Sequence, residues 1–409
     1  MAVQQSAKKR IPRSGKASQT LIKENYSNEL FFALVGPVGA GSSRAAKTLQ
    51  RELDVKGYQT IVIKASDAIR EWVERAGREL PPVGQKDIPS ITKMQNLGDE
   101  MRKDAQDYAI VAVHCIERIA RQRAEWQKTA YIPGNSIEPD GRPKAYIVDS
   151  LKHPAEAELF RRVYGAAFTL VGVVCEESCR EQRLTEVLFR KPDWKKGETK
   201  SQVSEFMQRD ADDQDRKWGQ HVIDTFHMAD FFADNSPDDP DDEKQFLNEP
   251  FGRLIDIVSH SRVHRPTTAE TAMHMAHSAA LRSMCMSRQV GAALVDRFGN
   301  VVATGTNEVP KAGGGVYGED LRELDSDGRC IAGCAEPQCA SNREQNKIVS
   351  ELIDAYPKLV EGADRAEVIQ GIRKSRIGGL LEFSRAVHAE MDAILSGLFD
   401  AASGIPEVT

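Results

Sequence analysis

The sequence lacks the long apolar runs, the excess of one charge and the paired cysteines that mark several classes of protein. No apolar run approaches the roughly 20 residues of a membrane-spanning helix, which argues against such a helix. The net charge of −6 over 409 residues gives no general attraction to nucleic acid, so an anionic ligand has to meet local positive groups. Seven cysteines, an odd number without a secretion signal, argue against a disulfide framework.

The sequence is long enough for two domains, since a typical single domain has about 100–200 residues. Residues 1–27 are basic with no apolar segment behind them, which predicts a disordered cytoplasmic tail. An acidic, proline-bearing stretch from Ser236 to Lys244 marks a change of composition, and we expect a linker over 237–265. The first domain is then expected over 28–236 and the second over 266–409, with a polar insertion over 311–376 that contains one helical stretch.

Short apolar segments alternate with helical patterns in the first domain. We expect strands at Glu29–Val35, Tyr58–Lys64, Ala145–Val148, Phe168–Val174 and Ala229–Ala233. Between Ile91 and Trp126 the pattern predicts one long helix or two packed end to end. Strands separated by helices are typical of an α/β fold with a doubly wound parallel sheet.

A glycine-rich loop joins the first strand to the next helix. Its residues are Gly36, Gly39, Gly41, Ser42 and Ser43. In this strand-loop-helix context the backbone N–H groups turn toward phosphates at the helix N-terminus. Asp149, at the end of its strand, fits the acidic residue that holds Mg²⁺ through water. The pattern predicts a P-loop nucleotide site, with a tight turn of no further role as the alternative.

The loop departs from the usual P-loop at one position. Ser42 stands where the lysine that reaches the β- and γ-phosphates is normally found. Four nearby cations could substitute for it: Arg44, Lys47, Arg180 and Arg183. The last two have the spacing of lid arginines in nucleotide kinases, which a solvated helix face would also give. We therefore expect nucleotide binding rather than efficient phosphoryl transfer.

His388, Ala389 and Glu390 open the last helical pattern, which begins near Val387. A neutral histidine is a zinc ligand, and a glutamate two residues on can face a coordinated water without binding the metal. Zinc lowers the pKa of such a water toward about 7. Glu390 would take its proton and deliver it to N3 of cytosine and then to the departing amino group, while hydroxide attacks C4. Alone, the pattern also fits a helix-start histidine beside a surface glutamate.

Upstream segments give this short pattern its context. A helix over Thr268–Met284 precedes two strands, Gln289–Val295 and Val301–Thr306, joined by a turn at Arg297–Asn300.

Three segments, SRQVGA at Ser287–Ala292, ATGTNEVP at Ala303–Pro310 and RAVHAEMDAI at Arg385–Ile394, resemble the cytidine and deoxycytidylate deaminase family in order and spacing. The resemblance implies a cytidine-deaminase-like α/β domain in which Asn307 contacts the sugar and Arg288 lies near the bound nucleotide.

Together the two halves resemble bacterial antiphage deoxycytidylate deaminases, which join a P-loop kinase-like domain to a deaminase domain. The resemblance runs from about Glu29 to Thr409. It implies zinc-dependent conversion of dCMP or dCTP to the uracil nucleotide and ammonia, which depletes the pool during phage infection. It also implies a cytoplasmic homo-oligomer with a regulatory nucleotide or another inhibitor at the first domain. Two alternatives stay open, a catalytically inactive nucleotide-sensing or assembly module and a P-loop nucleotide kinase.

The cysteines do not fit the family pattern. The family completes its zinc site with Pro-Cys-x-x-Cys after the histidine helix, and no cysteine follows Cys339. We therefore expect a truncated form of a longer parent, with one zinc ligand of three, inactive alone, and with exposed apolar sheet surface that favours association.

Other residues could bind metal. Cys330, Cys334 and Cys339 precede the histidine and could replace the missing ligands, hold a second zinc or remain free thiols. His274 and His277, three residues apart on a helix, could ligate a metal jointly or make ordinary hydrogen bonds.

Overall fold

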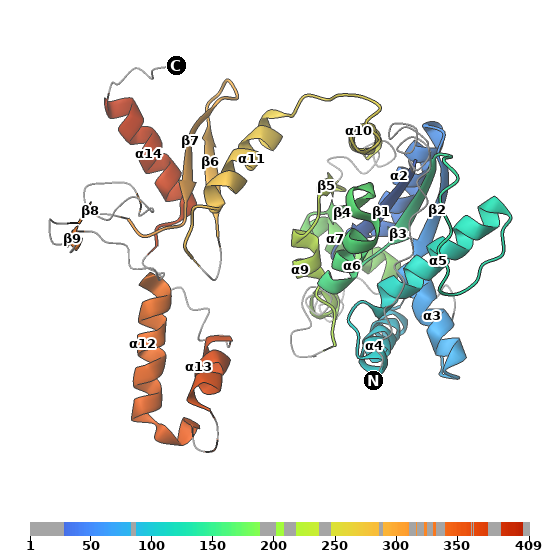
Figure 1. Ribbon diagram of the computed structural model, residues 1–409, viewed down its shortest axis with the longest axis horizontal. Coiled ribbons are helices and arrows are strands. Elements are labelled where there is room, and N and C mark those ends of the chain that lie inside the picture. The colour runs from blue at the N-terminus through green and yellow to red at the C-terminus, as the bar shows by residue number, and fades with distance from the viewer. Residues whose placement is uncertain are drawn as a thin grey trace, which may run out of the picture. The chain divides into compact units, whose positions relative to one another are not determined.

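The computed structural model describes most of the chain, and its elements fall into two units. The described residues are 28–82, 87–188, 202–207, 218–236, 247–285, 289–310, 316, 323–324, 330–332, 340–360, 362, 364–374 and 386–403. One unit runs from Met1 to His264 and the other from Arg265 to Thr409 (Figure 1). Among the described helices, none combines the length and apolar character needed to cross a membrane.

The first unit is built on a sheet of five parallel strands in the order β2-β3-β1-β4-β5. The strands are β1 (Glu29–Val35), β2 (Gln59–Lys64), β3 (Lys144–Asp149), β4 (Phe168–Val174) and β5 (Phe231–Asp234). All five were expected within a few residues of these bounds, and the doubly wound parallel α/β fold is confirmed. Because the strands are parallel, their carboxyl ends meet at one edge, where the loops after β1 and β3 lie side by side.

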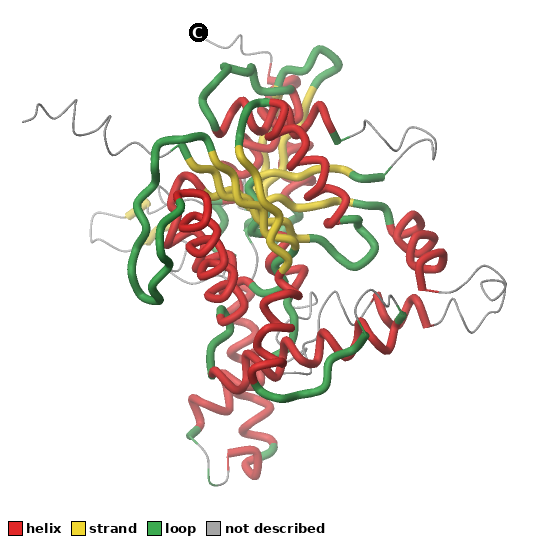
Figure 2. Tube along the Cα trace, turned by 90° about the vertical axis from the view of Figure 1, so that its right-hand side faces the viewer, coloured by secondary structure: helices red, strands yellow, loops and turns green. Residues whose placement is uncertain are grey.

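Helices cover both faces of this sheet (Figure 2). They are α2 (Ser42–Val55), α3 (Ala65–Arg75), α4 (Ile88–Ala105), α5 (Ile110–Gln127), α6 (Pro154–Tyr164), α7 (Glu177–Leu188), α9 (Val222–His227) and α10 (Asn248–Val258), with a 3-10 turn at Gly165–Ala167. Alternate residues of β1 point to opposite faces, as the strand period requires. Phe32 and Leu34 pack with α2 and α10, whereas Phe31 and Ala33 pack with α3, α5 and α6.

Two expectations for this unit are corrected or refined. The pattern between Ile91 and Trp126 forms two helices, because Gln106 adopts a left-handed conformation (φ 51°) at the end of α4. The expected linker over 237–265 contains a helix, α10. It packs on α2, where Lys56 bonds to Asp256 and Arg51 donates to Asn248 over 2.6 Å, so this part of the segment belongs to the first unit.

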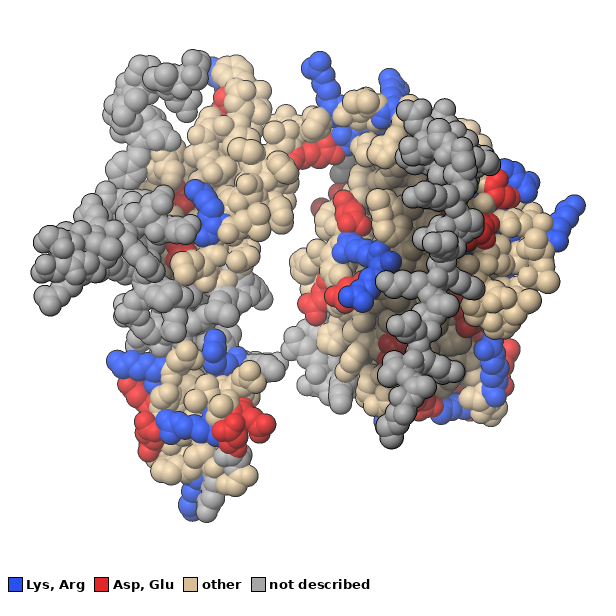
Figure 3. All heavy atoms as spheres, in the orientation of Figure 1, with Lys and Arg blue, Asp and Glu red and all other residues tan. Residues whose placement is uncertain are grey.

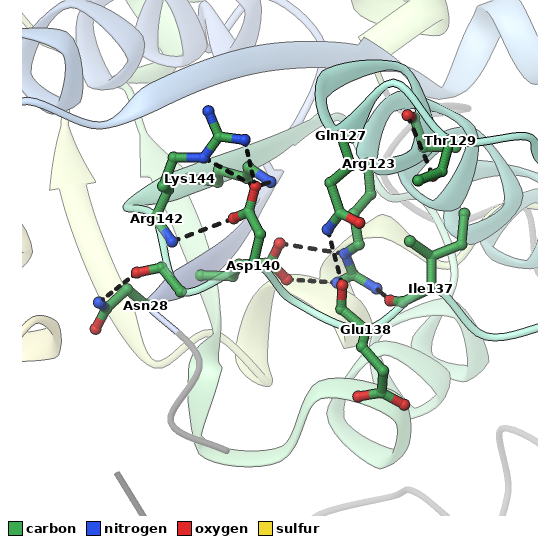
Figure 4. Close-up of polar contacts among 12 residues, drawn as sticks. Asn28, Arg123, Gln127, Thr129, Ile137, Glu138, Asp140, Arg142 and Lys144 are labelled. Carbon is green, nitrogen blue, oxygen red and sulfur yellow. Dashed lines mark hydrogen bonds and ion pairs between the residues drawn. The ribbon is translucent and has the colours of Figure 1, made fainter. Parts of the chain in front are cut away.

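The amino edge of the sheet carries a network of charged residues (Figure 4). Glu29, whose side chain is 1% exposed, pairs with Arg123 over 2.5 Å, and Arg123 also donates to the carbonyl of Ile137 over 2.9 Å. Lys144, which is fully buried, pairs with Asp140 over 2.8 Å. These bonds hold the loop before β3 against the end of the sheet opposite the glycine loop.

The second unit has a two-stranded antiparallel sheet at its centre. Its elements are α11 (Thr268–Ala280), β6 (Gly291–Val295), β7 (Val301–Thr306), β8 (Glu323–Leu324), β9 (Cys330–Ala332), α12 (Ala340–Ala355), a 3-10 turn (Pro357–Val360), α13 (Arg365–Lys374) and α14 (Ala389–Ser403). The insertion over 311–376 was expected to hold one helical stretch, and its described residues form two, α12 and α13. Figure 3 shows basic and acidic side chains mixed over these two helices. Arg365 of α13 and Asp354 of α12 form an ion pair of 2.9 Å.

Two glycines of this sheet allow helices to approach both of its faces. A Cβ on Gly291 would lie 1.8 Å from the carbonyl oxygen of Ala276 in α11. A Cβ on Gly305 would lie 2.1 Å from the carbonyl oxygen of Ala389 in α14. Gly291 and Gly305 point to opposite faces, since each pairs with the neighbour of the other across the hairpin. The start of α14 therefore sits directly on β7.

Candidate functional site

The glycine-rich loop of the first unit has the backbone shape of an anion site. Gly39 (φ 83°) and Gly41 (φ 86°) both adopt left-handed conformations, and α2 begins at Ser42 immediately afterwards. Left-handed glycines in a loop that enters a helix allow backbone N–H groups to turn toward one concave side, next to the positive end of the helix. The loop therefore has the geometry of a site for phosphate groups.

The acidic partner expected for this loop lies beside it. Asp149 ends β3 with a side chain that is largely buried, and its Oδ2 accepts a hydrogen bond from Ser43 Oγ over 2.6 Å. A hydroxyl and a carboxylate beside a phosphate loop are the oxygen ligands that Mg²⁺ uses in nucleotide sites. Gly36, which opens the loop, packs against Val173 of β4.

Two arginines of α7 lie against the loop. Arg183 Nη1 is 3.6 Å from the position of a Cβ on Gly41, and the Cβ of Arg180 is 3.1 Å from that on Gly39. Arg183 is held by the carbonyl of Asn235 (2.9 Å) and by Cys175 Sγ (3.2 Å). Burial raises the pKa of the Cys175 thiol, so it stays protonated beside the guanidinium. Of the four cations considered for the lysine role, these two contact the loop from α7.

Asn235 was missed by the sequence reasoning. It follows β5, is 4% exposed, and its Nδ2 donates to the carbonyl of Ala40 in the loop over 2.7 Å. Its backbone N–H donates to Val174 at the end of β4. The only signal in the sequence was a polar residue directly after a strand end.

The histidine and glutamate of the second unit lie at the start of α14. His388 precedes the helix, Glu390 is in its first turn, and both side chains are exposed, whereas Ala389 between them is buried against Gly305. Asp392 points back to the sheet, where its Oδ2 accepts from the backbone N–H of Thr306 over 2.9 Å. Ala389 and Asp392 thus pack against the sheet, whereas His388 and Glu390 face solvent near the end of β7.

Asn307, the predicted sugar contact, follows β7 in the same region. Its Oδ1 accepts from the backbone N–H of Val290 over 2.7 Å, and its N–H donates to the carbonyl of Val290. Its own carbonyl accepts from Ser283 Oγ over 2.7 Å. The amide oxygen of Asn307 therefore fixes the strand end in this structure.

The predicted metal ligands are only partly placed. In the residues that the structure describes, no group of three or more His, Cys, Asp or Glu side chains is arranged to hold a metal ion. Both His274 and His277 have exposed side chains on α11. Arg288, Cys334 and Cys339 lie outside the described residues, as does the side chain of Cys330. Of the predicted zinc ligands, the described part thus contains the side chain of His388 and not a full set.

Comparison with known families identifies the second unit. The family model of the cytidine and deoxycytidylate deaminase zinc-binding region matches residues 266–399. This range contains α11, β6, β7, the insertion and most of α14. The match confirms the deaminase-like C-terminal domain expected from the sequence and supports Zn²⁺, since it covers the zinc-binding region of that family.

Comparison with individual proteins gives more distant similarities. A UPF0200/UPF0201 protein of Archaeoglobus fulgidus is 25% identical over 244 residues, which is 58% of this chain and 61% of the relative. The chain thus spans 61% of the length of that curated relative. A gluconokinase from Sinorhizobium meliloti is matched over 58% of this chain and 100% of its own, at 13% identity and a TM-score of 0.28. An uncharacterised protein from Eubacterium ventriosum is matched over 57% and 99%, with the same identity and score.

Proposed function

We propose that this protein deaminates deoxycytidine nucleotides, dCMP or dCTP or both, to the uracil nucleotide and ammonia. Its role would be to deplete that pool in the cytoplasm during phage infection, as a homo-oligomer. The observation that carries the proposal is the family match over 266–399, together with His388 and Glu390 exposed at the start of α14. The family resemblance of the whole chain supports the deoxynucleotide and antiphage parts.

The chain's own residues would divide the chemistry between binding and proton transfer. His388 offers one imidazole to zinc, which when bound makes water a nucleophile near neutral pH. Glu390, exposed in the first turn of α14, would carry one proton from water to N3 of the ring and, after attack on C4, a second proton from the new C4 hydroxyl to the departing amino group. Asn307 and Arg288 are our candidates for the sugar side of the nucleotide.

The direct test measures ammonia release from dCMP and from dCTP separately, with zinc content determined on the same sample. It is run on this chain and on a version extended beyond Thr409 that carries a Pro-Cys-x-x-Cys motif. We expect the extended version to bind zinc and to deaminate at least one of the two nucleotides. If it holds zinc and leaves both nucleotides unchanged, the proposal is wrong.

For the first unit we propose a regulatory nucleotide site, with Mg²⁺ beside the phosphates. The 2.6 Å contact between Ser43 and Asp149, at the carboxyl edge of the sheet, favours it. Ser42 lacks the charge that the usual lysine provides, so binding without efficient phosphoryl transfer is the expected behaviour.

The nucleotide site is tested by calorimetric titration with ATP and Mg²⁺. Asp149→Asn should weaken Mg²⁺-dependent binding about tenfold or more, because one carboxylate charge near the metal is lost. When Mg²⁺ is omitted, wild type and Asp149→Asn should bind ATP with similar Kd values. If Asp149→Asn binds ATP and Mg²⁺ with the wild-type Kd, Asp149 is not part of the site. Formation of ADP that depends on an added nucleoside monophosphate would instead favour the kinase.

A further inference from the structure

Glu308 is a buried carboxylate that the proposed chemistry does not use. It directly follows Asn307 and is 5% exposed. Its Oε2 accepts from the backbone N–H of Met284 over 2.7 Å, and its Oε1 accepts from the N–H of Val309 over 2.8 Å. Both carboxylate oxygens are thus bonded to backbone, which is how a buried charge is stabilised without an ion pair.

The backbone of the same residue reaches the histidine turn. The carbonyl of Glu308 accepts from the N–H of Val387 over 3.0 Å, and Val387 immediately precedes His388. One residue therefore joins three segments that are far apart in the sequence: the loop after α11, the strand end after β7, and the turn that enters α14.

Neighbouring bonds make the same connections. Ser283 Oγ donates to the carbonyl of Asn307 over 2.7 Å, which is a second tie between the α11 end and the strand end. Asp392 Oδ2 accepts from Thr306 N–H over 2.9 Å, and Asp392 N–H donates to the carbonyl of His388 over 3.1 Å. The strand end is therefore fixed on both of its sides by buried polar groups.

We propose that Glu308 is a positioning residue of the deaminase site. It sets the turn that carries His388 and Glu390 against the strand end that carries Asn307, and it acts through backbone hydrogen bonds rather than by contact with substrate. The inference rests on the proposed deamination. It also gives a role to a charged side chain that is buried in the second unit.

The first test compares Glu308→Gln with Glu270→Gln by amide hydrogen exchange of the full chain. Glu270 is a matched control, since its carboxylate also accepts a backbone N–H, that of Thr267 over 2.7 Å, at the other end of α11. In Glu308→Gln an amide NH₂ replaces one acceptor oxygen. We expect exchange over residues 386–392 to rise about tenfold, because the lost side-chain bond to Met284 or Val309 lets residue 308 move, and its backbone carbonyl is the acceptor for Val387 in the turn. Glu270→Gln should leave that peptide unchanged.

The second test separates positioning from general stability by kinetics on a form that deaminates dCMP. Glu308→Gln should lower kcat about tenfold or more with KM within about threefold, because the proton-transfer group moves while the sugar contact remains. Faster exchange confined to residues 283–285 and 309, or an even rise across α11 and β6, would overturn the proposal, as would equal kcat values. An extended version that binds zinc and deaminates neither dCMP nor dCTP would contradict the proposed function, and the exchange result would still decide the role of Glu308.

Discussion

At the scale of single residues, the ion pair between Glu29 and Arg123 shows how burial changes the contribution of a charge to stability. Glu29 is held by Arg123 through two nitrogen contacts, of 2.5 and 3.2 Å, and by the hydroxyl of Tyr146 at 3.2 Å. Forming such a buried pair gains little, because both ions lose water. Removing one partner is costly, since the other charge is left buried alone.

We therefore predict that Arg123→Met lowers the free energy of unfolding of the first unit by about 3–5 kcal/mol. Urea unfolding followed by tryptophan fluorescence measures this, because all 4 tryptophans of the chain, at 72, 126, 194 and 218, precede the second unit.

Arg142→Met is the control at the same edge. The guanidinium of Arg142 is 65% exposed and pairs with Asp140 over 2.8 Å, so its loss should cost at most about 1 kcal/mol. If both variants lose the same small free energy of unfolding, Arg123 does not compensate the buried charge of Glu29.

Single residues also mark the limit of what the sequence could predict about the site. His388 and Glu390 followed from a local pattern, and the structure places both at the exposed start of α14. Glu308, Asp392 and Asn235 could not be found in the same way. Each acts on a backbone group that is at least 24 residues away in the sequence, and only the tertiary fold brings the two together.

At the scale of elements, the contact of α14 with β7 depends on a missing side chain. We predict that Gly305→Ala destabilises the second unit by about 1–3 kcal/mol, since the new Cβ would meet backbone atoms of Ala389 and Ala393 at 2.1 and 2.2 Å. Hydrogen exchange of the β7 and α14 peptides measures this loss of stability.

Gly371→Ala, in α13, is the matched control in the same unit. Nothing lies within 4 Å of its added Cβ, so the change should stabilise the helix by about 0.5–1 kcal/mol. Equal protection of α14 in wild type and Gly305→Ala would show that the helix does not need this close approach.

The attachment of α10 to α2 should depend on pH. Hydrogen bonds from Lys56 and then from His264 lower the pKa of Asp256 to about 2, from 3.8. A carboxylate with a lowered folded pKa stabilises the fold above the unfolded value and loses this effect as the pH falls through the folded value. The stability difference between wild type and Asp256→Asn should therefore shrink from about pH 5 to about pH 2.

Urea unfolding at a series of pH values, again followed by tryptophan fluorescence, gives this difference directly. Lys56→Met should reduce the same pH dependence, because it removes the first donor to Asp256. A difference that stays constant over the range would show that the Asp256 contacts do not favour the ionised carboxylate.

At the scale of the whole molecule, the sequence predicted the fold class better than the segment boundaries. Buried parallel strands read as short apolar runs, so β1 and β4 were placed to the residue. The helix α10 was missed because an acidic stretch before it suggested a linker. Its apolar residues Phe251, Leu254 and Ile255 are buried only because the fold packs them against α2 and the sheet.

The chain thus combines a parallel α/β unit that carries a glycine-rich loop with a deaminase-type unit. We propose that the second unit uses Glu390 for proton transfer in cytosine deamination. The most direct measurement is ammonia release from dCMP and dCTP by the zinc-loaded extended version and by its Glu390→Gln variant. We predict at least a hundredfold loss of kcat, about the contribution of one proton-transfer group, with zinc content unchanged. Ammonia release by Glu390→Gln at the wild-type rate would contradict the account.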